Sequence, residues 1–360
     1  MATPHLQFDN GTAYDLFVSL AVLHEPSDFG VRGAWAAGVR ARLSPEDRET
    51  LEKSQVLWRV PFHWIYDLPE PRDATTALLA LGQVPAGERV SLLAVSPDVC
   101  DEARELLESV ASQQSWSDED LEALRAACQP SSEHGGSKKA PSSEKLSKIL
   151  DLWAQAEEFG EQYLGALRAY HEAFFAEEEK RIRPALHTAL ERAQELAKQL
   201  SLLDLLEELT QGVRLDDLPE GEEMVLAPSY WSTPLVFMGM VSKERLVWLF
   251  GARPADASLV PGEVIPESLL RVLKAISDPT RLRILRDLSQ ETLAPSEISK
   301  RLRLRAPTVA HHLKTLRLAG LVQLTLGEEK TAKCYATRQE AVSAACESLK
   351  SFLRPDEDES

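Results

Sequence analysis

The stretch Pro307–Val322, PTVAHHLKTLRLAGLV, decides the fold of the C-terminal quarter of this chain. Val309, Leu313 and Leu316 recur at the spacing of one helix face, so we expect these three side chains in a core. The opposite face is polar and partly basic, and it carries Pro307, Ala310, His311 and Lys314. The stretch therefore predicts a helix from Pro307 to Ala319, with His312 near the edge of its inner face.

Three shorter helices are expected before this segment, over Ser268–Ser277, Thr280–Leu288 and Pro295–Leu302. Asp278 and Pro279 begin the second of them, because aspartate caps free N–H groups and proline needs no donor in a first turn. The inward residues expected in these helices are Leu269, Leu270, Leu273, Leu282, Leu285, Leu288, Ile298 and Leu302.

After the long helix, the pattern predicts a β-hairpin and one more helix. Gly320 supplies the left-handed residue that ends the helix. Val322–Leu326 and Ala332–Thr337 then read as two strands around a turn at 327–331. Ala341–Leu353 is amphipathic and predicts a final helix. A short helix, a tight turn and a longer helix with a polar, partly basic outer face are what a reader of the DNA major groove requires. The hairpin would be a wing that meets the phosphate backbone.

These segments resemble the ArsR/SmtB family of winged-helix repressors. The resemblance is carried by LLRVLKAISDPTRLRILRDL (269–288), by SEISKRLRLRAPTVAHHLKTLRLAGLV (296–322) and by the hairpin that follows, and it covers about a quarter of the chain. The remainder is weakly similar to members with a long N-terminal extension, through DLFVSLAVLHEP (15–26) and APSYWSTPLVF (227–237).

The resemblance implies a homodimeric repressor that binds an imperfect palindrome in double-stranded DNA. It implies a dimer interface formed by the first and last helices of the module, near Leu269, Leu270, Leu273, Ala345, Leu349 and Phe352. Together with the residue pattern, it predicts DNA contacts from Arg303, Arg305, Ala306, Pro307, Thr308, Ala310, His311, His312, Lys314, Thr315, Lys330 and Lys333.

Two departures from the family pattern affect this expectation. The family's metal sensors carry cysteines in the third helix, whereas Ala294–Ile298 has none, and the last helix offers only Cys346 with Glu347. We therefore expect no metal site, and adjacent histidines on a helix point about 100° apart and chelate one ion poorly. The second departure is Arg305, which stands where the family has a small capping residue; a cap is worth about 1 kcal/mol.

Charge is divided unevenly along the chain. The formal net charge is −17, but residues 267–354 carry 16 Lys/Arg against 9 Asp/Glu, a balance of +7, so the remainder carries −24. A basic module on an acidic body favours local binding of phosphates. The alternative is that these cations simply solvate a helical surface.

The first 262 residues are expected to be mainly helical. Region 1–128 contains a short strand at Leu6–Phe8, a helix at Thr12–Leu23 with one buried stripe, and helix starts at Ser44, Ser96 and Ser117. Residues 129–143 are rich in Pro, Gly and Ser and predict a flexible linker, either between domains or between two helices.

Region 144–262 is expected to hold further helices and a small antiparallel sheet at Glu223–Ala257, where turn residues separate short apolar runs. It is the candidate domain for an effector or partner. The module at 267–353 and an acidic tail at 354–360 complete the chain. The expected fold class is mainly α with small β elements, ending in a winged helix-turn-helix domain.

Several classes of protein lack support in the sequence. There is no secretory signal and no apolar run long enough to cross a bilayer. The four cysteines have no C-x-x-C spacing, which argues against a zinc ribbon or a disulfide framework and favours reduced thiols in a cytoplasm. None of the common catalytic, nucleotide-binding or metalloprotease motifs is present, so we expect neither an enzyme nor a cofactor.

The sequence thus predicts a cytoplasmic, dimeric DNA-binding regulator, with an N-terminal region that binds a small-molecule or protein effector. The competing hypothesis is an interaction or assembly protein that uses the winged helix for dimerisation only, since a fold does not determine a function.

Overall fold

The computed structural model describes residues 5–31, 33–128, 141–210, 212–215, 223–233, 235–254, 257, 266–326 and 333–353. The chain divides into two compact units, Met1–Arg192 with Pro219–Ala252, and Ala193–Leu218 with Arg253–Ser360. Most of the expected linker (129–140), the acidic tail (354–360) and Lys330 lie outside the described residues.

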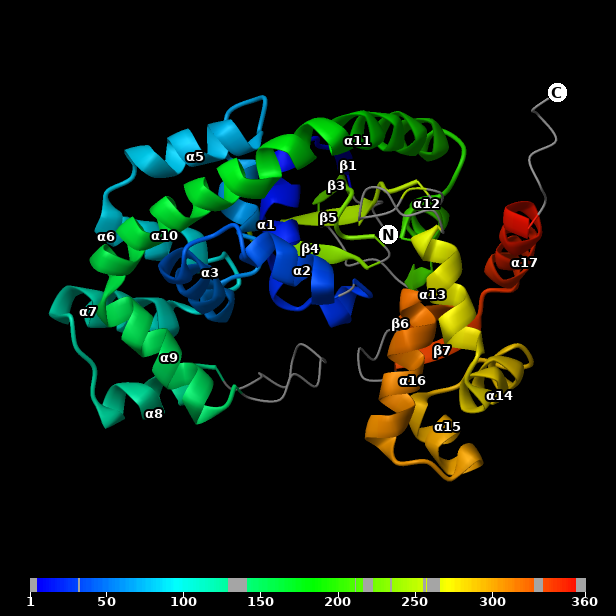
Figure 1. Cartoon of the computed structure of the whole chain (residues 1–360). Coiled ribbons are helices and arrows are strands. Elements are labelled where there is room, and N and C mark those ends of the chain that lie inside the picture. Colours follow the sequence, from blue (N-terminus) through cyan, green and yellow to red (C-terminus); the bar gives the residue numbers. More distant parts are fainter. Residues whose placement is uncertain are drawn as a thin grey trace. The chain divides into compact units, whose positions relative to one another are not determined.

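The N-terminal unit contains most of the helices and a four-stranded sheet (Figure 1). Its helices are α1 (Thr12–His24), α2 (Gly33–Arg40), α3 (Pro45–Leu57), α4 (Phe62–Tyr66), α5 (Ala74–Gln83), α6 (Ala86–Ala94), α7 (Asp101–Gln113), α8 (Asp118–Ala127), α9 (Ser143–Ala154), α10 (Ala156–Tyr170) and most of α11 (Ala176–Ala197). Its strands are β1 (Leu6–Phe8), β3 (Glu223–Ser229), β4 (Phe237–Met240) and β5 (Arg245–Gly251).

The C-terminal unit contains the expected winged helix. Its helices are α12 (Leu202–Leu209), α13 (Glu267–Ile276), α14 (Pro279–Leu288), α15 (Pro295–Leu302), α16 (Ala306–Leu318) and α17 (Gln339–Leu353). Its strands are β2 (Val213–Leu215), β6 (Val322–Leu326) and β7 (Lys333–Thr337). α12 and β2 precede residue 262, so this unit takes in more of the chain than the range 267–353 expected from the sequence.

The mainly helical fold class with small β elements is confirmed, but the strand pairing in the N-terminal unit differs from the expected antiparallel sheet. β1 and β5 both pair with β3 in parallel, and only β4 pairs antiparallel, at the edge beside β5. The predicted sheet included residues 223–257 alone, without the strand at Leu6–Phe8. A parallel pair needs a long connection, which the helices between β1 and β3 provide.

Helix α1 is the centre of the N-terminal core. Every residue from Thr12 to Leu23 is buried, so the expected single buried stripe was wrong. The helix contacts α3, α5 and β3, which enclose it from several sides (Figure 1). A helix covered all round needs no polar face. The helix start expected at Ser96 is also wrong: Ser96 binds Asp98 within a turn, and α7 begins at Asp101.

Asp15 on α1 fastens the loop that follows β3. Its side chain is fully buried, and it accepts hydrogen bonds from Ser229 Oγ (2.7 Å), Trp231 N (2.9 Å) and Tyr230 N (3.2 Å). Burial raises the pKa of Asp15 to about 6, although these hydrogen bonds oppose the shift. The carboxylate satisfies two backbone donors that would otherwise be buried without an acceptor.

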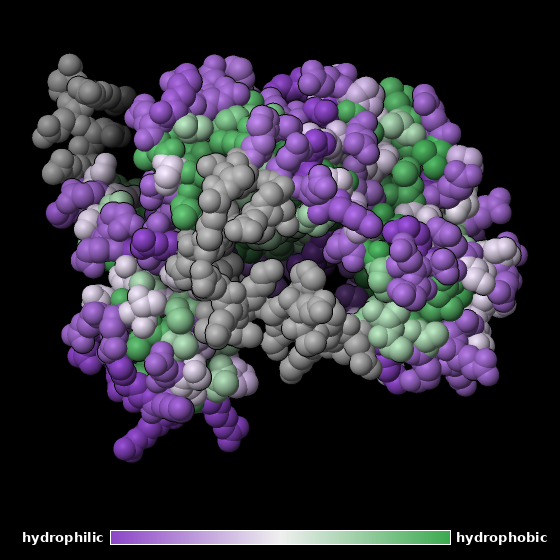
Figure 2. All heavy atoms as spheres, turned by 180° about the vertical axis from the view of Figure 1, so that it is seen from behind, coloured by the Kyte–Doolittle hydropathy of each residue, from purple (hydrophilic) through white to green (hydrophobic). Residues whose placement is uncertain are grey.

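Polar side chains cover much of the molecular face shown in Figure 2, with apolar side chains in separate patches. Among the described residues, no helix is both long and apolar enough to span a bilayer.

A pH titration of stability tests the assignment of Asp15. The folded carboxyl group has a pKa of about 6, above its ordinary 3.8, so the folded state binds a proton where the unfolded state does not. The free energy of unfolding should therefore fall as the pH rises from 4 to 6, by on the order of 3 kcal/mol. Asp15→Asn should abolish this slope, whereas Asp67→Asn, at an exposed position, should retain it.

Tryptophan fluorescence can follow this unfolding selectively, because all seven tryptophans lie in the N-terminal unit. An unchanged pH slope in Asp15→Asn would show that Asp15 is not the titrating group.

Candidate nucleic-acid interface

Helices α15 and α16 are joined by a tight turn with a defined geometry. Arg303 ends α15 in the left-handed conformation (φ 55°, ψ 41°), which a non-glycine residue adopts at some cost. The Leu304 N–H donates to Ser299 O at 3.0 Å, and Ser299 Oγ donates back to Leu304 O. These bonds close the end of α15 and fix the direction in which α16 leaves.

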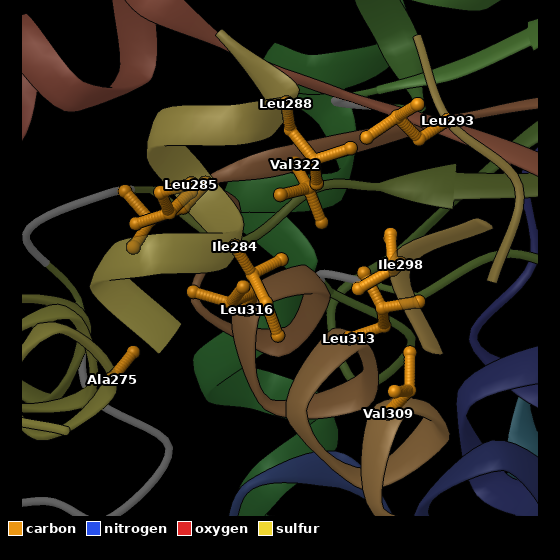
Figure 3. Packing of buried hydrophobic residues seen from close by; sticks show 11 residues of the cluster. Ala275, Ile284, Leu285, Leu288, Leu293, Ile298, Val309, Leu313, Leu316 and Val322 are labelled. Atoms are coloured by element: carbon orange, nitrogen blue, oxygen red, sulfur yellow. The ribbon is translucent and has the colours of Figure 1, made fainter. Parts of the chain in front are cut away.

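The inner face of α16 is the apolar face that the sequence predicts. Val309, Leu313 and Leu316 are each at most 1% exposed. Figure 3 shows them directed toward side chains of α14 and α15, with Leu316 beside Ile284 and Leu313 beside Ile298. Truncation of a buried leucine costs about 2–5 kcal/mol, so this packing determines which face of α16 points outward.

The outer face of α16 carries the residues predicted to read DNA. Ala306, Pro307, Thr308, Ala310, His311 and Lys314 are exposed, and His312 and Thr315 are half-buried. Thr315 Oγ1 donates to His311 O at 3.0 Å, a bond inside the helix. The structure thus brings the predicted α16 residues together along one accessible side, while their contact with DNA stays a prediction.

The N-terminus of α16 combines free cations with an uncapped helix end. Arg305 occupies the N-cap position and makes no side-chain cap, and Pro307 has no N–H. Arg303 and Arg305 are exposed, and neither pairs with an acidic residue among the described part of the chain. By contrast, Arg301 is bound to Glu291 at 2.7 Å. A helix N-terminus with unpaired arginines is suited to a phosphate group.

His312 lies on the boundary between the two faces, as expected. Burial lowers the pKa of its imidazole, although the nearby Asp278 carboxylate acts in the opposite direction. Asp278 caps α14 by accepting a hydrogen bond from Arg281 N at 2.9 Å, which confirms the expected helix start. The lowered pKa favours the neutral form of His312 beside the N-terminus of α14, which fits a packing role more closely than a phosphate contact.

The wing is larger than the predicted hairpin. β6 and β7 pair antiparallel as expected, and Leu293 forms a further bridge with Tyr335 on one side. On the other side β2 pairs with β6 in parallel, with a hydrogen bond from Leu324 N to Gly212 O at 2.8 Å. Lys333 is exposed at the start of β7, whereas Lys330 lies outside the described residues.

β2 could not be predicted from the sequence, because its three residues are separated from β6 by more than a hundred positions. Thr210 supports the strand: its Oγ1 donates to Leu206 O and accepts from Val213 N at 3.1 Å. The edge of the wing is therefore covered by a segment that precedes the module in sequence.

Three of the six residues expected at the dimer interface, Leu273, Ala345 and Leu349, line an apolar groove between α13, α14 and α17. Leu269 is buried within the unit, Leu270, Leu273, Ala345 and Leu349 are half-buried, and Phe352 is 41% exposed. Leu282, which was expected in the core, is 50% exposed. α14 buries Leu285 and Leu288 as expected, and it buries Ile284 in place of Leu282. The groove has a volume of about 300 Å³, and both Leu282 and Leu349 line it.

Comparisons with known proteins agree with this architecture. A helix-turn-helix domain family matches residues 276–325, which include α14, α15 and α16. A family of unknown function, DUF5937, matches residues 5–227, more than half of the chain. The predicted combination of an ArsR-type helix-turn-helix domain with a long N-terminal extension is thereby confirmed.

One curated relative is an uncharacterized HTH-type transcriptional regulator from Methanocaldococcus jannaschii, which is 38% identical over 58 residues. The match covers 16% of this chain and 65% of the relative.

The missing cap of α16 can be tested by restoring it. Within the described part of the chain, the Thr308 N–H donates only to the Arg305 carbonyl oxygen, at 3.0 Å. Arg305→Ser adds a side-chain hydroxyl acceptor at this N-cap position, so we expect the free energy of unfolding of the C-terminal unit to rise by about 1 kcal/mol. Arg305→Ala removes the same charge without adding a cap and should leave the stability nearly unchanged. Hydrogen exchange at the Leu313 and Leu316 amides measures this unit separately. Equal protection in the serine and alanine variants would contradict the assigned helix start.

Proposed function

The chain belongs to the DUF5937 family of unknown function, and because it also carries a helix-turn-helix domain we propose that it is a sequence-specific DNA-binding transcriptional regulator. The single observation that supports this most strongly is the outer side of α16. It presents exposed polar and basic residues behind an uncapped, positively polarised helix end. Such a helix has the size and the donors needed in a major groove.

Within this proposal, each residue type has a distinct role. Arg303, Arg305 and Lys333 neutralise backbone phosphates and position the protein, as cations do at most protein–DNA interfaces. Pro307, Thr308, Ala310 and His311, near the start of α16, approach base edges. Lys314 lies one turn further along α16 and contacts either a phosphate or a base edge.

We further propose an ArsR-type homodimer that acts as a repressor. α14 and α17 present an exposed apolar surface, formed by the groove and by the side chains of Leu282, Phe352 and Leu353. Contact of such a surface with water is unfavourable. A second copy would cover it by two-fold symmetry and would set two α16 helices against the half-sites of a palindrome.

The N-terminal unit is proposed as the effector- or partner-binding module rather than as an enzyme. It contains a pocket of about 270 Å³ between α1, α2 and α3, lined by His24, Arg40 and Glu52 among others. Small ligands bind in concave sites of this kind, where polar groups in the wall fix the orientation of the ligand. Ligand binding there would alter the spacing of the two reading helices.

Binding to the DNA upstream of the protein's own gene tests the reading helix. The triple variant Arg305→Ala, His311→Ala, Lys314→Ala should lose most of its affinity in a gel-shift titration. The slope of log affinity against log salt should become shallower by roughly 2, because each lost phosphate contact removes about 0.9 from it.

The matched control removes two exposed cations of the N-terminal unit, Lys53→Ala with Lys148→Ala, and should retain the wild-type slope. If the triple variant keeps both affinity and slope, α16 is not the DNA-binding helix. If the wild type shows no salt-dependent binding to any promoter segment, the interaction or assembly function is favoured instead.

The dimer proposal has its own test in sedimentation velocity. Leu349→Asp with Phe352→Asp places two carboxylates beside the groove, and burying them unpaired in an interface is strongly unfavourable. We expect a monomer at concentrations where the wild type is a dimer. Leu79→Asp changes an apolar residue of the N-terminal unit that is 62% exposed and should remain dimeric. A dimeric double variant would exclude this surface as the interface.

A further inference from the structure

Two cysteines that lie far apart in the sequence meet at one end of a helical hairpin. α7 and α8 pack against each other and are joined by a short connection, residues 114–117. Two helices with so short a connection run antiparallel, so the start of α7 lies opposite the end of α8. Cys100 is the N-cap residue of α7, and Cys128 is the C-cap residue of α8.

Side-chain contacts agree with this topology. Cys100 Sγ lies 3.9 Å from the carbonyl oxygen of Ala127, the residue that directly precedes Cys128. Burial raises the pKa of the Cys128 thiol, and the neighbouring Cys100 raises it further. Both thiols are free, with Cys100 exposed and Cys128 half-buried.

We propose that Cys100 and Cys128 are a redox-modification site of the N-terminal unit, which peroxide converts into a reversible intramolecular disulfide. The sequence spacing predicts reduced thiols without a disulfide framework, and the four cysteines are free in the structure. Spacing could not reveal that Cys100 and Cys128 are neighbours, because the hairpin, rather than a short sequence motif, brings the two residues together.

The chemistry balances with hydrogen peroxide as the oxidant. The Cys100 thiolate attacks one peroxide oxygen, the O–O bond breaks, and the departing oxygen leaves as water after taking up a proton, which leaves a sulfenic acid on Cys100. The Cys128 sulfur then attacks the Cys100 sulfur, forming the S–S bond and releasing the sulfenic oxygen as a second water. The two thiols lose two electrons in total, and one peroxide molecule gains them.

The positions of the two residues assign this order of attack. Cys100 is the more accessible of the two thiols, so peroxide reaches its sulfur first. Cys128 is partly covered and is held protonated by burial, which suits a resolving thiol that reacts only after its neighbour is oxidised.

The consequence of oxidation is a closed covalent loop around α7 and α8. These helices also pack against α9, and the three occupy one end of the unit (Figure 1). A cross-link restricts the unfolded chain far more than the folded hairpin, so oxidation should raise the unfolding temperature of the N-terminal unit.

The test is peptide mapping of the full-length, fully reduced protein after titration with hydrogen peroxide and blocking of the remaining thiols. We expect the peptides that contain Cys100 and Cys128 to become linked within one chain, with loss of two hydrogens, and to separate again in dithiothreitol. The unfolding temperature reported by tryptophan fluorescence should rise in parallel.

Serine variants separate the roles of the cysteines. Neither Cys100→Ser nor Cys128→Ser should gain stability on oxidation, whereas Cys334→Ser with Cys346→Ser should behave as the wild type does. In Cys128→Ser, the sulfenic acid of Cys100 should be captured by dimedone. The proposal is overturned if Cys346, an exposed thiol of the other unit, is oxidised while Cys100 and Cys128 remain unlinked, or if the link forms only between chains.

Discussion

The packing of α16 on α14 and α15 is the constraint on which the C-terminal unit depends. Leu316 packs beside Ile284, and Leu313 packs beside Ile298. These contacts determine the rotation of α16 about its own axis, because any other rotation would expose these side chains to water. That rotation places His311 and Lys314 outward. The core therefore does more than stabilise the unit: it selects the residues that are available to a partner.

The turn before α16 completes this arrangement at a local cost. Arg303 adopts a left-handed conformation that glycine would adopt more easily, and Arg305 leaves the helix without a side-chain cap. Both positions give up some stability, and both hold an unpaired cation near the helix N-terminus. Residues that depart from the locally favoured choice are often found at functional sites, and here they coincide with the end of the helix that would meet phosphate.

Local sequence patterns predicted the winged helix in detail, because its core is made by short-range periodicity. Val309, Leu313 and Leu316 follow helical spacing, and Asp278 and Gly320 mark helix ends through chemistry that a single sequence reveals. The exposure of Leu282 could not be predicted in this way, since Ile284 beside it is equally apolar and tertiary packing chose between them. β2 was missed for a related reason: nothing in Val213–Leu215 indicates that it pairs with β6.

The N-terminal unit was predictable as helical but not as a fold, because its determining contacts are long-range. Asp15 and Ser229 are 214 positions apart, and the parallel pairing of β1 with β3 brings the first strand beside a late one. A carboxylate inside an apolar helix gives no sign in the sequence of the backbone donors it will meet. The same limit applies to Cys100 and Cys128, which only the α7–α8 hairpin places together.

The proposed function requires that the outer face of α16 contacts DNA. A photoreactive side chain in place of His311 tests this contact by cross-linking to a promoter fragment that the protein binds. We expect a strong cross-link from position 311, which salt suppresses, and only background from position 79, an exposed site on α5. Equal, weak cross-linking from both positions, with bound DNA present, would contradict it.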